Sequence, residues 1–340
     1  MSKTIMITGG TGYIGSWIAK YLLEAGNTLR LCVRDESKTE KYDFLLEIAK
    51  ENNANLEIHE ADLLKLGSYD EIAKGCDEIF HIASPFSLKI KDAQKQLIDP
   101  ALIGTKNVLE SASKSGTVKR VILTSSVAAV HGDNKDMKDQ GLSEFNESHW
   151  NKTSNIKHQP YSYSKVLAEG EAWKINEIQN NWDLVVINPS FVMGPTLSKG
   201  SLSGSIDFME DIIKGKFAMG APKLMFGFVD VRDVAKAHIL ASNNANAKGR
   251  YILAERCMSV MDMTKIIEAR FPGKFKLPKM ISPKLLMYVV GPMFGITAKF
   301  VSNNIGYPIK LNTTKSTKDL GLKYSSMENA IEEMIVQMTE

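Results

Sequence analysis

Tyr161 and Lys165 are the residues of this sequence whose types and spacing best suit acid–base chemistry. They lie four positions apart and share one face if the segment is a helix, whereas Tyr163 is followed at that spacing by Leu167. A phenol with a pKa of about 10 donates a proton poorly at neutral pH, and a neighbouring ammonium favours the phenolate and lowers that pKa. Tyr161 is therefore the candidate proton donor, and Lys165 is expected to tune its pKa.

A carbonyl oxygen that receives this proton also needs a second donor to polarise it. Ser126 closes the run Thr124-Ser125-Ser126 at the end of an apolar stretch, and it is expected to donate to the same oxygen as Tyr161. Lys165 is further expected to hydrogen-bond the ribose of a bound dinucleotide and to fix it for hydride delivery. Because a Tyr-x-x-x-Lys motif also arises by chance in a chain with ten Tyr, its weight depends on what precedes it.

A glycine-rich turn near the N-terminus precedes it at a suitable distance. Gly9, Gly12 and Gly15 form a Gly-x-x-Gly-x-x-Gly pattern between the apolar run Ile5–Ile7 and an amphipathic stretch, which predicts a strand, a turn and a helix. Glycine allows the tight turn and the approach of backbone to phosphate, so the helix amides would face a dinucleotide pyrophosphate. A purely structural turn is the alternative. The expected cofactor contacts in this turn are Gly9, Thr11, Gly12, Tyr13, Ile14 and Gly15.

The residue after the predicted second strand, Thr28–Val33, bears on the choice of dinucleotide. NAD sites usually place a carboxylate there for the ribose 2′-hydroxyl. This sequence has Arg34, followed by Lys38 and Lys41, and a guanidinium pairs well with a 2′-phosphate. NADP is therefore favoured as the cofactor. NAD stays an alternative because Asp35 lies next to Arg34. A further alternative is that the three basic residues are solvated surface cations with no role in cofactor binding.

The elements that would position these residues alternate between strand-like and helical patterns. Such alternation predicts an α/β fold with a Rossmann-type doubly wound parallel sheet and a smaller C-terminal substrate lobe. Asp62 and Leu63 follow the third strand, where the carboxylate is placed to accept from the adenine amino group; an exposed loop Asp is the alternative. The predicted strands are Ile5–Thr8, Thr28–Val33, Leu56–His59, Glu78–Ile82, Val121–Ser125 and Leu184–Asn188.

Composition and charge argue against several classes of protein. With 340 residues, of which 44% are hydrophobic and 24% charged, the chain has the composition of an ordinary globular protein. Its net charge of +3 is small and its charged residues are interspersed, so no nucleic-acid partner is expected. Cys32, Cys76 and Cys257 are isolated and the histidines are scattered, so neither a metal site nor a disulfide framework is expected. Because the first strand begins close to Met1, no signal peptide is expected and we predict a cytoplasmic protein.

One apolar stretch, from Leu285 to Phe300, is too short for a membrane span and is interrupted by Gly291-Pro292. It is predicted to be buried or to form part of the substrate lobe, with a helix lying on a membrane surface as the alternative. No membrane partner is therefore expected.

Taken in order, these motifs resemble those of the extended short-chain dehydrogenases/reductases, in the dihydroflavonol-4-reductase-like branch. The resemblance covers nearly the whole chain and extends to residues 81–86, 104–109, 188–195 and 228–235. It implies a catalytic triad of Ser126, Tyr161 and Lys165, with Asn107 as a fourth member. The segments that it implies to line the cofactor contribute Ala83, Ser84, Pro85, Pro189, Ser190 and Val192.

Within that branch, residues 126–130 and 144–151 resemble fungal and bacterial reductases of methylglyoxal, isovaleraldehyde and bulky ketones more than plant flavonoid reductases. Cinnamoyl-CoA reductases carry Asn-Trp-Tyr-Cys-Tyr-Gly-Lys around the catalytic Tyr, where residues 159–165 read Gln-Pro-Tyr-Ser-Tyr-Ser-Lys, and this difference weakens a CoA-thioester role. The resemblance therefore implies reversible, NADPH-dependent reduction of aldehydes or ketones to alcohols.

The predicted domain boundary lies near residue 190. Residues 1–190 would mainly bind NADP, residues 191–340 would mainly form the substrate lobe, and residues 228–255 would return to the first domain. The lobe segment from Ser198 to Phe228 is apolar, which fits a pocket for an apolar or aromatic substrate and equally fits core packing. The candidate substrate contacts are Phe86, Ser126, His131, Met193, Phe208 and Met225.

Two other functions stay open. A nucleotide-sugar epimerase or dehydratase shares the fold but must hold a diphosphate, for which Lys214, Lys216, Lys223 and Arg232 are the candidate cations. A non-catalytic NADP-sensing protein would bind the dinucleotide only, and the retained Ser, Tyr and Lys argue against it. The expected partner is a small carbonyl or alcohol substrate, and the sequence is compatible with a monomer or a homodimer.

Overall fold

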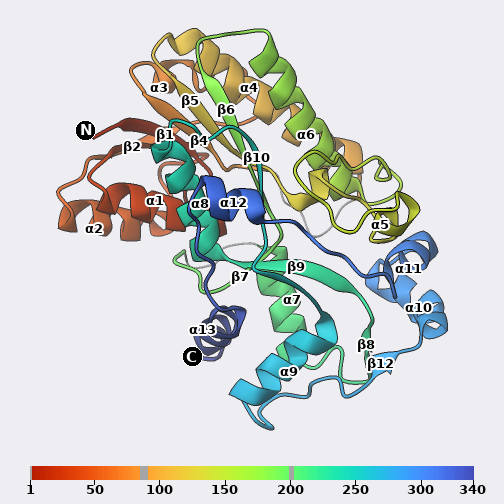
Figure 1. The fold of residues 1–340 in the computed structure, drawn as a ribbon. Helices are drawn as coiled ribbons and strands as arrows, with labels where there is room; N and C mark the ends of the chain where they lie inside the picture. Colours follow the sequence, from red (N-terminus) through yellow and green to blue (C-terminus); the bar gives the residue numbers. More distant parts are fainter. Residues whose placement is uncertain (1, 85–90, 199–202) are drawn as a thin grey trace.

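The computed structural model describes residues 2–84, 91–198 and 203–340. Its centre is a seven-stranded sheet in the order β10-β6-β5-β4-β1-β2-β3, and all neighbouring strands in it are parallel (Figure 1). The strand order reverses between β1 and β4, which confirms the predicted Rossmann-type sheet. Its strands are β1 (Thr4–Thr8), β2 (Thr28–Val33), β3 (Leu56–Glu60), β4 (Glu78–His81), β5 (Arg120–Thr124), β6 (Asp183–Pro189) and β10 (Gly249–Leu253).

The six strands predicted from hydrophobic runs all exist, and each observed end lies within one residue of its predicted position. The central strands β1, β4, β5 and β6 are largely buried and read as nearly continuous apolar runs, which makes them visible in the sequence, whereas the edge strand β3 alternates apolar and polar residues and is only partly buried. The seventh strand, β10, was not predicted as a strand, although it lies within the segment expected to return to the first domain.

Helices cover both faces of this sheet (Figure 1). On one face, Ile18, Leu45 and Val234, from α1, α2 and α8, share a core cluster with Ile5 of β1. On the other face, α3, α4 and α6 pack over Met6, whose side chain alternates with that of Ile5. The helices are α1 (Tyr13–Glu24), α2 (Asp43–Glu51), α3 (Asp70–Ala73), α4 (Asp99–Ser115), α6 (Pro160–Glu177) and α8 (Val231–Asn243).

A smaller unit lies below the sheet in Figure 1. Its three-stranded sheet has the order β11-β9-β7, and α7, α9 and α13 enclose a core that includes Met209, Phe228, Met263 and Met334. A two-stranded pair, β8 with β12, continues from it. The elements are β7 (Phe191–Met193), α7 (Gly204–Ile213), β8 (Ala221–Pro222), β9 (Met225–Asp230), β11 (Arg256–Ser259), α9 (Val260–Arg270), β12 (Ile281–Ser282), α10 (Lys284–Val290), α11 (Ala298–Asn304) and α13 (Met327–Thr339).

Short helical segments complete the chain, and one of them bears on the domain division. The short segments are η1 (Thr39–Lys41), η2 (Gln94–Ile98), η3 (Val127–Ala129), α5 (Lys135–Asp139), η4 (Gly291–Phe294) and α12 (Thr314–Asp319). Of the returning segment, α8 and β10 belong to the large sheet unit, whereas β9 lies in the small sheet. Leu320 and Leu322, after α12, join the core of the large unit. We propose that the C-terminal half returns twice, first from Val231 and again around α12.

The apolar stretch from Leu285 to Phe300 belongs to the smaller unit but is not buried as a whole. Met287 is the buried residue of α10, while Leu285 and Val289 are 81% and 75% exposed. Of the two alternatives predicted for this stretch, burial is therefore wrong for α10, and a place in the substrate lobe stays a prediction. In the described part of the chain, no helix is long and apolar enough to cross a membrane.

Candidate functional site

A cavity of about 1310 Å³ lies between the carboxyl ends of the large sheet and the smaller unit. The glycine turn, the segments after β2, β3, β4 and β5, and the start of α6 line one side of it. Segments β7 and β9 and the helix α11 line the other side. Open parallel sheets bind their ligands at this edge, next to the point where the strand order reverses.

The glycine turn has the close backbone packing that a dinucleotide pyrophosphate requires. Gly9 has a φ of +71°, and a Cβ on it would lie 2.7 Å from the amide nitrogen of Ala83. A Cβ on Gly15 would lie 2.0 Å from the carbonyl oxygen of Gly9. Gly12 precedes α1 without a side-chain cap, so within the described chain the first amides of this helix face the cavity free of such a partner. The turn therefore fits the pyrophosphate of a dinucleotide.

Two aromatic side chains of α1 fasten this turn to the start of the smaller unit. The Tyr13 hydroxyl donates to the carbonyl oxygen of Gly194 at 2.6 Å, and the Trp17 indole donates to that of Pro195 at 2.9 Å. Burial, followed by the nearby Asp230 carboxylate, raises the pKa of Tyr13, which keeps its hydroxyl protonated as a donor. The turn and the segment after β7 are thus held at a fixed separation.

Basic side chains gather where the ribose of the dinucleotide would lie. Arg34, Lys38 and Lys41 all line the cavity. Lys38 pairs with Asp35 at 3.3 Å, and hydrogen bonds from Ser37 and then Lys38 hold the pKa of Asp35 below its usual value. Because Asp35 is already engaged by these neighbours, it is poorly placed to serve a ribose hydroxyl, whereas Arg34 has no ion-pair partner among the described residues.

Asp62 and Leu63 line the cavity beyond β3, as expected for contacts with the adenine end. Asp62 accepts a hydrogen bond from the Leu64 amide at 2.7 Å, which shapes this loop. Asn107 lies behind the loop, 2% exposed, where its side chain donates to the carbonyl oxygens of Leu63 and Lys65 and accepts from the Gly67 amide. The geometry therefore gives Asn107 a role in shaping the adenine loop instead of the expected place among the reacting groups.

Tyr161 and Ser126 face the same cavity from different elements. Tyr161 lies in the first turn of α6, directly after Pro160, a residue type favoured at that helix position. Ser126 follows β5, where its hydroxyl accepts from the Ala128 amide at 3.1 Å and caps η3. The Tyr161 side chain is 38% exposed because it faces the cavity.

The pKa of Tyr161 is raised in this structure. Removal of the phenol from bulk water raises its pKa to about 12, and a hydrogen bond with Ser126 opposes that rise. Lys165 lies over the Tyr161 ring, 5.7 Å from its centroid, and does not offset the burial. In this structure the Lys165 ammonium donates to Ser84, and the expectation that Lys165 lowers the pKa of Tyr161 stays a prediction. Tyr161 is protonated at neutral pH and is available as a donor.

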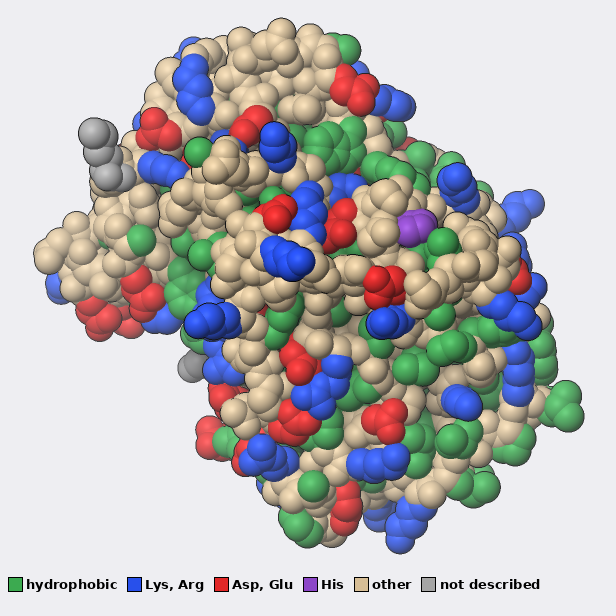
Figure 2. Space-filling view, in the orientation of Figure 1, with side chains coloured by type: hydrophobic (Ala, Val, Ile, Leu, Met, Phe, Trp, Pro, Cys, Tyr) green, Lys and Arg blue, Asp and Glu red, His purple; other side chains and the backbone are tan. Residues whose placement is uncertain are grey.

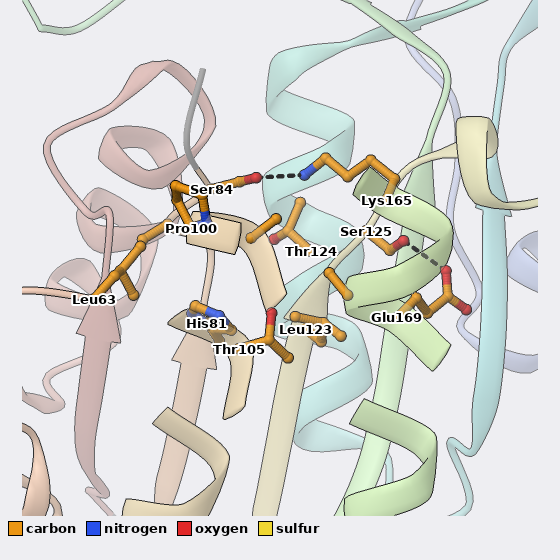
Figure 3. A pocket seen from close by; sticks show the side chains of 13 residues that line it. Leu63, His81, Ser84, Pro100, Thr105, Leu123, Thr124, Ser125, Lys165 and Glu169 are labelled. Atoms are coloured by element: carbon orange, nitrogen blue, oxygen red, sulfur yellow. Dashed lines mark hydrogen bonds between the residues drawn. The ribbon is translucent and has the colours of Figure 1, made fainter. Parts of the chain in front are cut away.

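Lys165 points across the cavity floor towards the segment after β4 (Figure 3). Its ammonium donates to the Ser84 hydroxyl at 2.9 Å. Burial lowers the pKa of Lys165 to about 8, and the negative charge of Glu169 opposes this change. A small pocket of about 20 Å³ beside these residues is also lined by Thr105 and Ser125 and has room for about one water molecule.

Glu169 is a buried positioning residue that the sequence reasoning missed. Its carboxylate accepts from Ser125 at 2.5 Å and from Asn188 at 2.8 Å, and it lies 2.6 Å from the Arg250 guanidinium. These contacts tie α6 to β5, β6 and β10 directly behind Lys165. The available sequence signal was the spacing of four residues between Lys165 and Glu169, which puts both on one helix face.

A second buried cluster holds the start of α6. Asp133 is 1% exposed and accepts from His158 and Gln159, which precede the helix, and from Asn303 and Asn304 of α11. Burial raises the pKa of Asp133, but these hydrogen bonds outweigh it and the pKa is lowered overall. Gln159 has a φ of +56°, an uncommon conformation outside glycine, and its bond to Asp133 stabilises it. The cluster thus connects the segment before Tyr161 to the smaller unit.

The substrate end of the cavity is mainly apolar. Met225, His131 and Phe226 line the cavity, together with Phe191, which the sequence reasoning did not single out, and their contact with a substrate stays a prediction. His131 stacks on Phe145 at 5.0 Å between ring centroids, and burial lowers its pKa to about 4, so the ring is neutral.

Other predicted contacts fall in different places. Ala83, Ser84, Ser190 and Val192 line the cavity. Met193 is fully buried in the core of the smaller unit, and Phe208 packs against that core with its ring 5.2 Å from Phe191. Neither residue is among those that line the cavity, so their predicted substrate contacts are not supported. Pro189 ends β6 behind the lining, and Pro85 and Phe86 lie outside the described residues.

Comparison with known proteins gives consistent matches. The model of the NAD dependent epimerase/dehydratase family matches residues 5–254. The chain is 37% identical to cinnamoyl-CoA reductase CAD2 of Medicago truncatula, over 100% of this chain and 97% of the relative. Among solved structures, Gre2 of Candida albicans in complex with NADPH has a TM-score of 0.79 and 30% identity, covering 99% and 98% of the two chains. Yeast methylglyoxal/isovaleraldehyde reductase Gre2, also with NADPH, has a TM-score of 0.80 and 28% identity, covering 98% of each chain.

Proposed function

The chain belongs to the NAD dependent epimerase/dehydratase family, as an NAD(P)-dependent reductase of the extended short-chain type, and we propose that it reduces aldehydes and ketones to alcohols with NADPH. The observation that carries this proposal is the convergence of Ser126, Tyr161 and Lys165 on one cavity with the glycine turn. The reaction is reversible, and the same groups serve the oxidation of the alcohol.

Ser126, Tyr161 and Lys165 have separate roles in the reduction. Bound NADPH supplies the hydride that reaches the carbonyl carbon. Tyr161 donates the proton of its hydroxyl to the carbonyl oxygen, and its raised pKa keeps that proton in place at neutral pH. Ser126 donates a hydrogen bond to the same oxygen and stabilises its developing negative charge. Lys165, which is already directed across the cavity floor, holds the ribose hydroxyls and supports the Tyr161 phenolate after proton transfer.

The choice of NADPH rests on the basic cluster after β2. Arg34, Lys38 and Lys41 line the cavity where a 2′-phosphate would lie, and Asp35 is engaged by Ser37 and Lys38. A planar guanidinium binds a phosphate through two hydrogen bonds, which the ribose hydroxyl of NADH cannot match. The NADPH complexes of the Gre2 structures support the same choice.

The lining of the substrate end favours an apolar carbonyl compound over a nucleotide sugar. Lys214 and Lys216 are exposed and pair with Glu210 and Asp211. Arg232 pairs with the buried Asp230 at 2.7 Å and with Glu333 at 2.6 Å. These three cations are engaged in ion pairs, and neither they nor Lys223 line the cavity, so an epimerase or dehydratase would lack its diphosphate clamp.

Initial rates of NADPH oxidation test the proposal directly. Purified protein is assayed with aldehydes, bulky ketones, dihydroflavonols and a cinnamoyl-CoA thioester, with Tyr161→Phe as the variant and Tyr163→Phe as the matched control. We expect turnover of simple carbonyls, a loss of about 10² to 10⁴ in kcat for Tyr161→Phe, and little change for Tyr163→Phe. NADPH binding, followed by titration, should survive in both variants.

Other outcomes would assign another function. NADPH binding without turnover of any carbonyl would favour the sensor, and conversion of a nucleotide sugar with no net change in NADPH would favour the epimerase. Turnover of the thioester alone would replace the proposed aldehyde and ketone substrates by a CoA ester.

A further inference from the structure

An unusual charge distribution marks the segment that carries α10 and α11. Residues 270–310 contain Arg270, Lys274, Lys276, Lys279, Lys284, Lys299 and Lys310 and no Asp or Glu. This segment therefore carries seven positive charges, while the whole chain carries a net +3, so the rest is net negative. A cationic run of this kind creates a positive field on one part of the surface.

Exposed apolar side chains gather in the same region. Seven of the fifteen large hydrophobic side chains that are exposed in the described residues lie at position 219 or within 280–289. Met219 is 95% exposed, and Leu285 and Val289 project from one face of α10 because they are four residues apart. Single exposed hydrophobic residues are common on soluble proteins, but such a concentration marks an interaction site.

Backbone pairing brings these residues together. The Ala221 amide donates to the carbonyl oxygen of Met280, and the β8–β12 pair sets Ala221, two residues after Met219, opposite Ile281. The Lys284 ammonium donates to backbone carbonyl oxygens at the end of α11, which joins α10 to α11. We call this surface the basic apolar face: its apolar members are Met219, Met280, Ile281, Leu285 and Val289, and its basic members are Lys223, Lys276, Lys279 and Lys299.

The basic members are available to a partner. Lys223, Lys276, Lys279 and Lys299 are exposed, and none forms an ion pair with a carboxylate in the part of the chain that the structure describes. Figure 2 shows green and blue side chains together at this corner, over α10, α11 and the β8–β12 pair, with red side chains scarce. The surface therefore combines projecting apolar groups with uncompensated positive charge.

We propose that the basic apolar face docks onto an anionic lipid bilayer. Projecting Met, Leu and Val side chains enter the boundary between head groups and acyl chains, and lysines around them attract anionic head groups. A second copy of the chain is a poor occupant, because a symmetric interface would place this cationic surface against itself. The protein would lie on the membrane surface without spanning it. This agrees with the alternative stated for residues 285–300, a helix that lies on a membrane surface.

Vesicle flotation tests the proposal with the full chain. Wild type is mixed at low salt with vesicles of phosphatidylcholine alone or of phosphatidylcholine with phosphatidylserine. We expect binding to the mixed vesicles only, and loss of that binding at high salt. Lys276→Glu with Lys279→Glu should weaken the partition constant at least about tenfold. Leu285→Gln with Val289→Gln should weaken it in addition by removing the inserted groups.

A matched control separates these effects from changes in total charge and hydrophobicity. Lys50→Glu with Lys119→Glu reverses two exposed lysines outside the face, as the charge variant does within it, and Ile178→Gln removes an 85% exposed isoleucine; both controls should leave binding unchanged. NADPH binding and the thermal midpoint verify that each variant is folded.

Three results would overturn the proposal. Wild type could fail to float with the mixed vesicles at low salt, or both face variants could bind as well as wild type. Sedimentation velocity could instead reveal a dimer that Leu285→Gln with Val289→Gln dissociates, which would make the face an interface between two copies.

Discussion

Replacing Arg34 by Ala is the sharpest test of how the cavity selects its cofactor. A charge-assisted interaction contributes about 1.5 to 3 kcal/mol, which corresponds to roughly 10- to 150-fold in affinity. Arg34 is exposed at the cavity rim, where solvent screens its charge, so we expect the lower part of this range, about 10- to 40-fold for NADPH. NADH has no 2′-phosphate, and its affinity should change by less than about twofold.

The assay is titration of each cofactor, with KM values from carbonyl reduction as a second readout. Lys38→Ala is the matched control, because Lys38 already pairs with Asp35 at 3.3 Å and an exposed pair adds little. It should weaken NADPH by only about two- to fivefold. An equal loss of NADPH and NADH affinity in Arg34→Ala would refute the assignment of Arg34 to the 2′-phosphate.

Substitutions of buried residues test how the site is supported. Burial lowers the pKa of Lys165 to about 8, so its ammonium is lost as the pH rises through that value. Glu169→Gln removes the opposing negative charge and should move the alkaline limb of the kcat–pH profile down by roughly half a unit; an unmoved limb would contradict the coupling. Gly15→Ala places a Cβ 2.0 Å from a backbone oxygen and should lower the free energy of unfolding by about 1 to 3 kcal/mol in urea titration, whereas Gly170→Ala has open space and should not destabilise the helix. Asp133→Ala leaves several buried donors without an acceptor and should lower the free energy of unfolding by about 3 kcal/mol or more in the same assay. A loss below about 1 kcal/mol would show that the cluster is not needed for stability.

The sheet and the cofactor end of the cavity were predictable because short stretches of sequence determine them. Each buried parallel strand is a continuous apolar run, and the turn from Gly9 to Gly15 carries its geometry in its own residue types. Tyr161 and Lys165 are likewise related by one helical turn. These relations join residues that are close in the sequence, so the packing of distant segments does not change them.

The supporting contacts were not predictable, because they join distant segments. Glu169 meets Arg250 across 81 residues, and Asp133 meets Asn304 across 171. In the sequence, Asp133 looks like an ordinary loop carboxylate, and only the packing of α11 against that loop buries it. Met193 was expected at the substrate end, but the pairing of β7 with β9 turns it into the core.

This difference in range explains why the cofactor is better determined than the substrate. A dinucleotide at the glycine turn would touch turns that follow strands of one sheet, and the positions of those turns are fixed once the sheet forms. The opposite wall combines β7, β9 and α11, and the Asp133 cluster joins α11 to the segment before Tyr161. A change in those lobe segments can reshape the substrate end while the glycine turn and the basic cluster stay in place. We therefore expect substrate preference of this chain to depend on tertiary contacts of the smaller unit, and its contacts with a dinucleotide to depend mainly on the sheet.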